Sequence, residues 1–199
     1  MKASTVRPKH KHIGLWGVGL WLCASAAQAS SLPAADANGT VLSLGSGPSL
    51  AFELPLPFNT RLGGSAGTPF YYFSRFGIAN YDLRLQFPLL KQEGFMITVV
   101  AGVFGQVNLS PLPLTDPLSP LGLEMGACFS YLFSEQWRIR LNLVPGFDFF
   151  LPPENKMSFG WTFLTPASGF EVAWRFNPHF EASLGFNGNG DILSLSGIF

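Results

Sequence analysis

The chain has 199 residues, of which 47% are hydrophobic, 15% aromatic and only 12% charged. Soluble proteins of this size usually carry about a quarter of their residues as charged side chains, so this composition is unusual for one. Twelve basic and twelve acidic residues give a formal net charge of zero.

The first 29 residues read as a secretory signal peptide. A basic stretch from Lys2 to Lys11 precedes the mostly apolar segment 13–26, and Ala27-Gln28-Ala29 is a small-x-small cleavage site. The apolar segment is too short for a convincing spanning helix. Bulky Leu22 stands before Cys23, where a lipoprotein signal requires a small residue, so we expect cleavage before Ser30.

Removal of this signal peptide changes the net charge of the chain. The mature chain keeps eight Lys and Arg against twelve Asp and Glu, a formal charge of −4. That balance argues against nucleic acid or anionic lipid held by a basic patch. Cys128 is the one cysteine after the leader, so no intrachain disulfide is expected. We divide the chain into the signal peptide 1–29, a short leader 30–39 and one domain, 40–199.

Apolar and polar residues alternate along most of this domain. The odd positions from 121 to 133 are apolar, while the even positions from 122 to 130 are Gly, Glu, Cys and Ser. Residues 137–149 show the same period of two, with Arg138, Arg140 and Asp148 on the polar face. Because no run of 18 apolar residues follows the leader, the pattern indicates a soluble β-sandwich or a lipid-facing barrel. The many Gly, Ser and opposite charges on the polar face favour the barrel.

Turn residues divide the alternation into strands. We predict an all-β, antiparallel, up-and-down transmembrane barrel of eight strands, at about 40–56, 70–90, 94–108, 121–133, 137–149, 160–176, 179–187 and 191–199. Ten strands result if residues 78–80 and 165–167 are hairpin turns. The apolar face switches between Phe163 and Phe170, so the sixth strand needs a bulge or a break near Pro166. The turns 91–94, 134–136 and 177–178 would be periplasmic, and the loops 57–69, 109–120 and 150–159 external.

The leader, the alternating strands and the final Phe199 resemble the small outer-membrane barrels of Gram-negative bacteria, such as the OmpA transmembrane domain. In that group an aromatic terminus and the alternate apolar residues before it are read by the barrel-insertion machinery. Leu193, Leu195 and Phe199 match this assembly signal, whereas Gly197 departs from the usual bulky residue. The resemblance implies outer-membrane localisation, contact with outer-membrane lipid and with the assembly machinery, and a monomer.

Charged residues on the polar face should point into the barrel. They are Glu53, Asp82, Arg84, Glu124, Arg138, Arg140, Asp148, Glu171, Arg175 and Glu181. An eight-stranded barrel is only wide enough for its side chains to fill, and unpaired buried charges are costly, so these should form ion pairs. A filled lumen predicts a structural or surface-interaction protein. A narrow porin-like channel is the alternative.

A lipid A-modifying enzyme is a second alternative, because some small outer-membrane barrels have such activity. His179, with Glu181 and Ser183 on the next strand, is the one group that could serve. The simpler interpretation is that His179 lies in a turn at the membrane interface. We therefore expect no catalytic, cofactor-binding or metal-binding residues. We expect an interfacial belt from the aromatic residues Trp137, Trp161, Trp174, Tyr71, Tyr72 and Tyr131.

Overall fold

A computed structural model describes residues 32–34, 37–68, 77–109, 119–150 and 158–199. They form the strands β1 (Val41–Gly45), β2 (Ser49–Pro55), β3 (Arg61–Gly67), β4 (Ile78–Gln92), β5 (Phe95–Asn108), β6 (Leu121–Leu132), β7 (Trp137–Leu143), β8 (Gly146–Phe150), β9 (Ser158–Thr162), β10 (Gly169–Asn177), β11 (Phe180–Asn187) and β12 (Leu193–Ile198). Within these ranges no helix is long and apolar enough to cross a membrane. The signal peptide, Tyr71 and Tyr72 lie outside the described residues.

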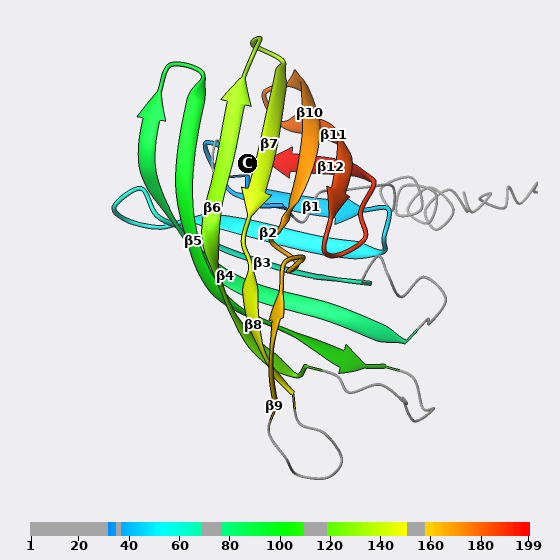
Figure 1. Ribbon diagram of the computed structural model, residues 1–199. Coiled ribbons are helices and arrows are strands. Elements are labelled where there is room, and N and C mark those ends of the chain that lie inside the picture. Colours follow the sequence, from blue (N-terminus) through cyan, green and yellow to red (C-terminus); the bar gives the residue numbers. More distant parts are fainter. Residues whose placement is uncertain (1–31, 35–36, 69–76, 110–118, 151–157) are drawn as a thin grey trace, which may run out of the picture.

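Ten of the strands close into an antiparallel barrel. The order around it is β5-β4-β3-β2-β1-β12-β11-β10-β7-β6, and β6 pairs again with β5. The first and last strands meet with Val41 opposite Ile198 and Gly45 opposite Ser194. In Figure 1 the long strands β4 to β6 extend beyond the short strands β1 to β3 and β10 to β12. The predicted all-β, antiparallel barrel is confirmed.

The remaining two strands, β8 and β9, form a hairpin outside the ring. β8 pairs with the first part of β6 and with β9. Val144 and Pro145 separate β7 from β8, and residues 163–168 separate β9 from β10. The predicted break near Pro166 is therefore present, and it allows the β8–β9 hairpin to extend beyond the barrel (Figure 1).

The predicted count of eight strands is wrong, and the ten strands do not come from the turns proposed as the alternative. The segment 40–56 is two strands, joined by a turn at residues 46–48. β3 lies within the stretch predicted as the external loop 57–69. Residues 78–80 begin β4, and residues 165–167 belong to the break between β9 and β10 rather than to a hairpin turn.

The two ends of the barrel differ. We call one the terminal end: residues 37–40 and Phe199 lie there, with the turns 56–60, 93–94, 133–136 and 178–179. The opposite, or loop, end carries the turn 46–48 and the connection 188–192, and β3 and β5 end on this side. The predicted placement of 57–69 on the loop side is thus corrected, because residues 57–60 turn at the terminal end.

The faces of the barrel invert the usual arrangement of a water-soluble protein. Among the described residues 27 polar or charged side chains are buried, against 14 hydrophobic ones. Most of the large exposed side chains on the strands are apolar, among them Leu123, Met125 and Leu143. Polar groups thus fill the lumen and apolar groups cover the outside.

Candidate functional site: the filled lumen

An ion-pair cluster connects the neighbouring strands β2, β3 and β4 on the inner face of the barrel. Glu53 Oε2 lies 3.1 Å from Arg61 Nε, and Glu53 Oε1 lies 3.6 Å from Arg84 Nη2. Arg84 Nη1 lies 2.6 Å from Asp82 Oδ2, and Gln86 Nε2 donates to Glu53 Oε1 at 2.7 Å. All five residues are buried. Paired in this way, the charges avoid the several kcal/mol that isolated buried ions cost.

A second ionic cluster connects β7, β10 and β11. Arg140 Nη1 lies 2.6 Å from Glu171 Oε1 and 2.7 Å from Glu181 Oε1. The other oxygen of Glu181 lies 3.2 Å from Arg138 Nε and 3.1 Å from Arg175 Nη2. Three guanidinium groups therefore share two carboxylates.

Glycines stand opposite the large charged side chains. Glu53 faces Gly63, Arg84 faces Gly63 on one side and Gly102 on the other, and Glu171 faces Gly185. A Cβ at Gly63 would lie 3.1 Å from Arg84 Nε. The glycines leave the space that the long side chains occupy.

Residues 32–34 and 37, which precede β1, lie inside the barrel. Leu32, Ala34 and Ala37 are 3%, 7% and 5% exposed. Ala34 N donates to Glu53 Oε1 at 2.9 Å, and Arg61 donates to Ala37 O at 2.8 Å through Nη1. The predicted leader 30–39 therefore includes residues that are part of the lumen contents.

This N-terminal segment reaches from the terminal end towards the loop end. Arg61 Nη2 donates to Gly39 O at 2.7 Å, near the start of β1. Leu32 lies instead against a small cavity lined by Ser183, Asn187 and Asp191, where β11 and β12 meet. Because a ten-stranded barrel is wider than an eight-stranded one, its lumen has room for this segment in addition to side chains.

The connection between β11 and β12 folds inward at the loop end. β11 and β12 form an antiparallel hairpin with Leu184 opposite Leu193, and Asn187, Asn189 and Asp191 at their connection are all buried. Asp191 accepts from Gly47 N at 3.1 Å and from Ser49 Oγ at 2.7 Å. The turn is thereby held across the loop end of the lumen.

The break between β9 and β10 also fills the interior. Thr165 Oγ1 and Ser168 Oγ donate to Val144 O at 2.7 and 2.8 Å. Gly188 N donates to Ser168 O at 3.1 Å, which joins this break to the inward turn. Three segments from different parts of the chain thus occupy the lumen together.

The structure places the sequence-predicted charges on the inner side of the ring, except Asp148, which lies on β8 outside it. Glu124 and Asp148 are buried on β6 and β8, outside the two clusters just described, and the side chain of Arg175 is 20% exposed. Sequence reasoning missed Arg61 and Asp191. The sequence predicts a loop at Arg61, and Asp191 follows a turn whose inward direction no local pattern reveals.

Different partners hold the three residues considered for an enzymatic alternative, His179, Glu181 and Ser183. His179 Nδ1 lies 3.1 Å from Ile198 O, whereas Ser183 Oγ donates to Glu171 Oε2 at 2.8 Å. Glu181 is held by the three arginines of the second cluster. Among the residues that the structure describes, no group of three or more His, Cys, Asp or Glu could hold a metal ion.

The residues proposed as an assembly signal lie along β12 and at its end. Leu193 is 39% exposed and Phe199 is 69% exposed. Leu195 faces Leu44 of β1 and Ala182 of β11. Phe199 N and O both bond to Thr40, at 2.9 Å each, which extends the closure of the barrel by one residue.

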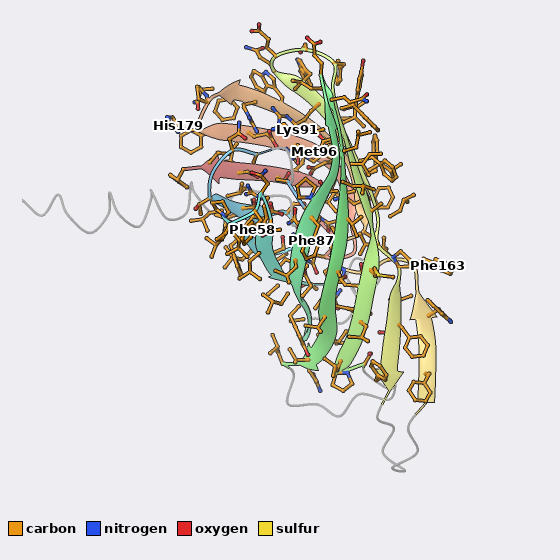
Figure 2. All side chains as sticks on the ribbon, turned by 90° about the vertical axis from the view of Figure 1, so that its left-hand side faces the viewer. Phe58, Phe87, Lys91, Met96, Phe163 and His179 are labelled. Carbon is orange, nitrogen blue, oxygen red and sulfur yellow. The ribbon has the colours of Figure 1, made fainter. Side chains whose placement is uncertain are left out.

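Outward aromatic residues gather at both ends of the barrel. Near the terminal end Trp137 stacks on Trp174 with ring centroids 6.0 Å apart, and Phe176 stacks on Phe180 at 6.1 Å. On the β8–β9 hairpin the rings of Phe147, Phe149, Phe159 and Trp161 contact one another, with centroids 5.3 to 5.6 Å apart. Phe163, just beyond β9, points away from the barrel in Figure 2.

Comparisons of the chain with protein-family models, with curated proteins and with solved structures give no match. The function is therefore inferred from the lumen and the outer surface of the barrel.

Proposed function

We propose that this protein is an outer-membrane β-barrel with a closed lumen, and that it has a structural or surface-interaction role rather than one in solute passage. The observation that carries the proposal is the filling of the lumen by ion pairs, the N-terminal segment and the inward turn. A barrel closed by its own chain leaves its loops and outer surface as the parts available to a partner.

The outer surface supports the membrane location. Soluble monomers rarely expose apolar patches of more than a few hundred Å², yet here large apolar side chains cover the outward positions of most strands. A closed barrel leaves no unpaired strand edge in its ring, as a spanning sheet requires.

The spacing of the two aromatic groups supports it further. Trp137 and Phe147 are ten positions apart along β7 and β8, which corresponds to about 33 Å of strand at roughly 3.3 Å per residue. At the tilt of about 40° usual for such barrels, this distance corresponds to a height of about 25 Å, which matches the apolar band between aromatic girdles.

Fractionation and conductance test the proposal. When the full chain is expressed in a Gram-negative bacterium, it should be recovered with the outer membrane and show heat-modifiable gel mobility. The refolded protein should leave a planar bilayer electrically closed. Recovery as a soluble periplasmic protein would refute the membrane location. Steady single-channel currents would refute the closed lumen and support the channel alternative.

A further inference from the structure

The β8–β9 hairpin leaves one strand edge unpaired. β9 stands last in the strand order, and β8 is its one strand partner among the described residues. Because the ring itself is closed, the outer side of β9 is the free edge of the described sheet. The hairpin extends beyond the barrel in Figure 1, where a strand of another chain could reach it. The backbone N–H and C=O groups on that side are therefore available for pairing.

β9 lacks the features that protect free edges. Natural edge strands carry charged side chains, proline or bulges that discourage pairing with another chain. The five residues Ser158–Thr162 include no charge and no proline, and all five pair with β8 without a register shift. This regular, uncharged edge is suited to the addition of a strand.

The sequence of β9 is self-complementary in an antiparallel pair. A two-fold axis at Gly160 would place the two glycines opposite each other, and Phe159 opposite Trp161 of the second copy. The side chains of Phe159 and Trp161 are 57% and 73% exposed, so both are available for this contact. Aromatic residues directly opposite each other are among the pairs that stabilise antiparallel sheets.

The hairpin already contains contacts of this type. Phe147 lies opposite Trp161 and Phe149 opposite Phe159, with ring centroids 5.3 and 5.6 Å apart. The two-fold axis would add one Phe159–Trp161 pair on each of its sides. Since β9 has no charged residue, no like charges would face each other across the axis.

We propose that β9 pairs with β9 of a second copy of this chain, so that the outer hairpins of two barrels form one continuous antiparallel sheet. A contact between identical surfaces closes on itself and gives a dimer rather than a filament. A second copy supplies the matching order of residues by symmetry, which favours it over an unrelated strand. The dimer differs from the monomer that the resemblance to small outer-membrane barrels implies.

The oligomeric state tests the proposal. Protein purified in non-ionic detergent, from whichever cell fraction contains it, should be a dimer by sedimentation equilibrium, so the result does not depend on the membrane location. Phe159→Lys should raise the dissociation constant of the dimer about tenfold or more, because both symmetry-related aromatic pairs are lost. Phe149→Lys changes the cross-strand partner of Phe159 on β8. It is the matched control and should leave the dimer as tight as in the parent protein.

Disulfide cross-linking tests the register of the dimer. Cys128→Ala removes the one other cysteine after the predicted signal peptide. In this background, chains with Phe159→Cys and chains with Trp161→Cys should cross-link when they are mixed, because the two positions face each other. Either chain alone should cross-link little, since like positions would lie about 8 Å apart across the axis, beyond the limit of roughly 7 Å for a disulfide.

Three results would overturn the proposal. The first is a monomeric parent protein. The second is a dimer that Phe159→Lys weakens no more than Phe149→Lys does. The third is equal cross-linking in mixed and unmixed samples of the two cysteine variants.

Discussion

Arg84 on β4 and Gly102 on β5 face each other across the sheet, and a Cβ at position 102 would lie 2.9 Å from both Cα and Cβ of Arg84. Real Cβ atoms are essentially never found so close to another atom. The buried guanidinium group that links Glu53 to Asp82 therefore depends on a missing side chain on the next strand.

We expect Gly102→Val to destabilise the barrel by about 1 to 3 kcal/mol, the usual cost of overpacking a filled interior. Urea unfolding of the refolded protein, followed by tryptophan fluorescence, measures this cost. Val103→Leu, on the neighbouring outward position, is the control and should unfold like the parent. Equal stability of Gly102→Val and the parent would show that the lumen has spare room at this point.

Removal of Arg140 should lower the free energy of unfolding more than removal of Arg138 or Arg175, because Arg140 contacts both carboxylates of the second cluster. Arg140→Met should lower the free energy of unfolding by about 3 to 5 kcal/mol. The double variant Arg140→Met with Glu171→Leu should recover part of this loss, which a double-mutant cycle would reveal. Arg175→Met is the comparison: its partly exposed ion pair should cost about 1 kcal/mol or less. Strictly additive losses would contradict the pairing.

The N-terminal segment should act as a plug. Deletion of residues 30–37 removes the Ala34 amide that donates to Glu53 and the Ala37 carbonyl that accepts from Arg61. We expect the deleted barrel to fold and to conduct ions, because ten strands enclose more space than side chains alone fill. Planar-bilayer recording measures the conductance, with the full-length mature protein as the control. A correctly folded deletion variant that leaves the bilayer closed would show that the inward turns suffice.

Deletion of Phe199 separates stability from recognition during assembly. It removes two backbone hydrogen bonds to Thr40, each worth about 0.5 to 1.5 kcal/mol. Since the side chain is largely exposed, we expect a modest loss in refolding but a large loss in outer-membrane level. Phe199→Ala keeps the backbone bonds and should show the assembly defect alone. Normal membrane levels of both variants would rule out a role in recognition.

Strands with large outward side chains could be predicted from the sequence. In β6 and β7, Leu, Met and Trp alternate with Gly, Glu and Arg, and the structure places these sets on opposite faces. The strands that could not be predicted are those whose residue pattern is typical of a different structure. Leu44 and Leu50 keep the same phase of alternation through the turn at 46–48, so β1 and β2 read as one strand.

β3 was missed for a different reason. Its outward positions are Leu62, Gly64 and Ala66, which are mostly small and give no apolar alternation. The turn before it uses Phe58 and Asn59 with φ of 62° and 58°. A phenylalanine in that conformation is not the Asn-Gly or Asp-Gly signal by which such turns are recognised.

The lumen contents could be predicted only in part. Alternation alone identified the inward charges, because their direction follows from the strand. The N-terminal segment and residues 165–168 enter the barrel through contacts far away in the sequence, such as Ala34 with Glu53 and Gly188 with Ser168. No local pattern encodes such contacts.

The proposed membrane-spanning barrel has its outer face in lipid, and quenching by brominated phospholipids measures this contact. Three tryptophans follow the predicted signal peptide: Trp137, Trp161 and Trp174. With these replaced by phenylalanine, a single tryptophan at position 141 (Leu141→Trp) would lie four residues along β7 from Trp137, or about 13 Å of strand. In liposomes it should be quenched most by bromines deep in the acyl chains and remain inaccessible to iodide, whereas a variant retaining only Trp137 should be quenched most by shallow bromines. Quenching of the tryptophan at 141 by iodide but not by brominated lipid would contradict the membrane-spanning barrel.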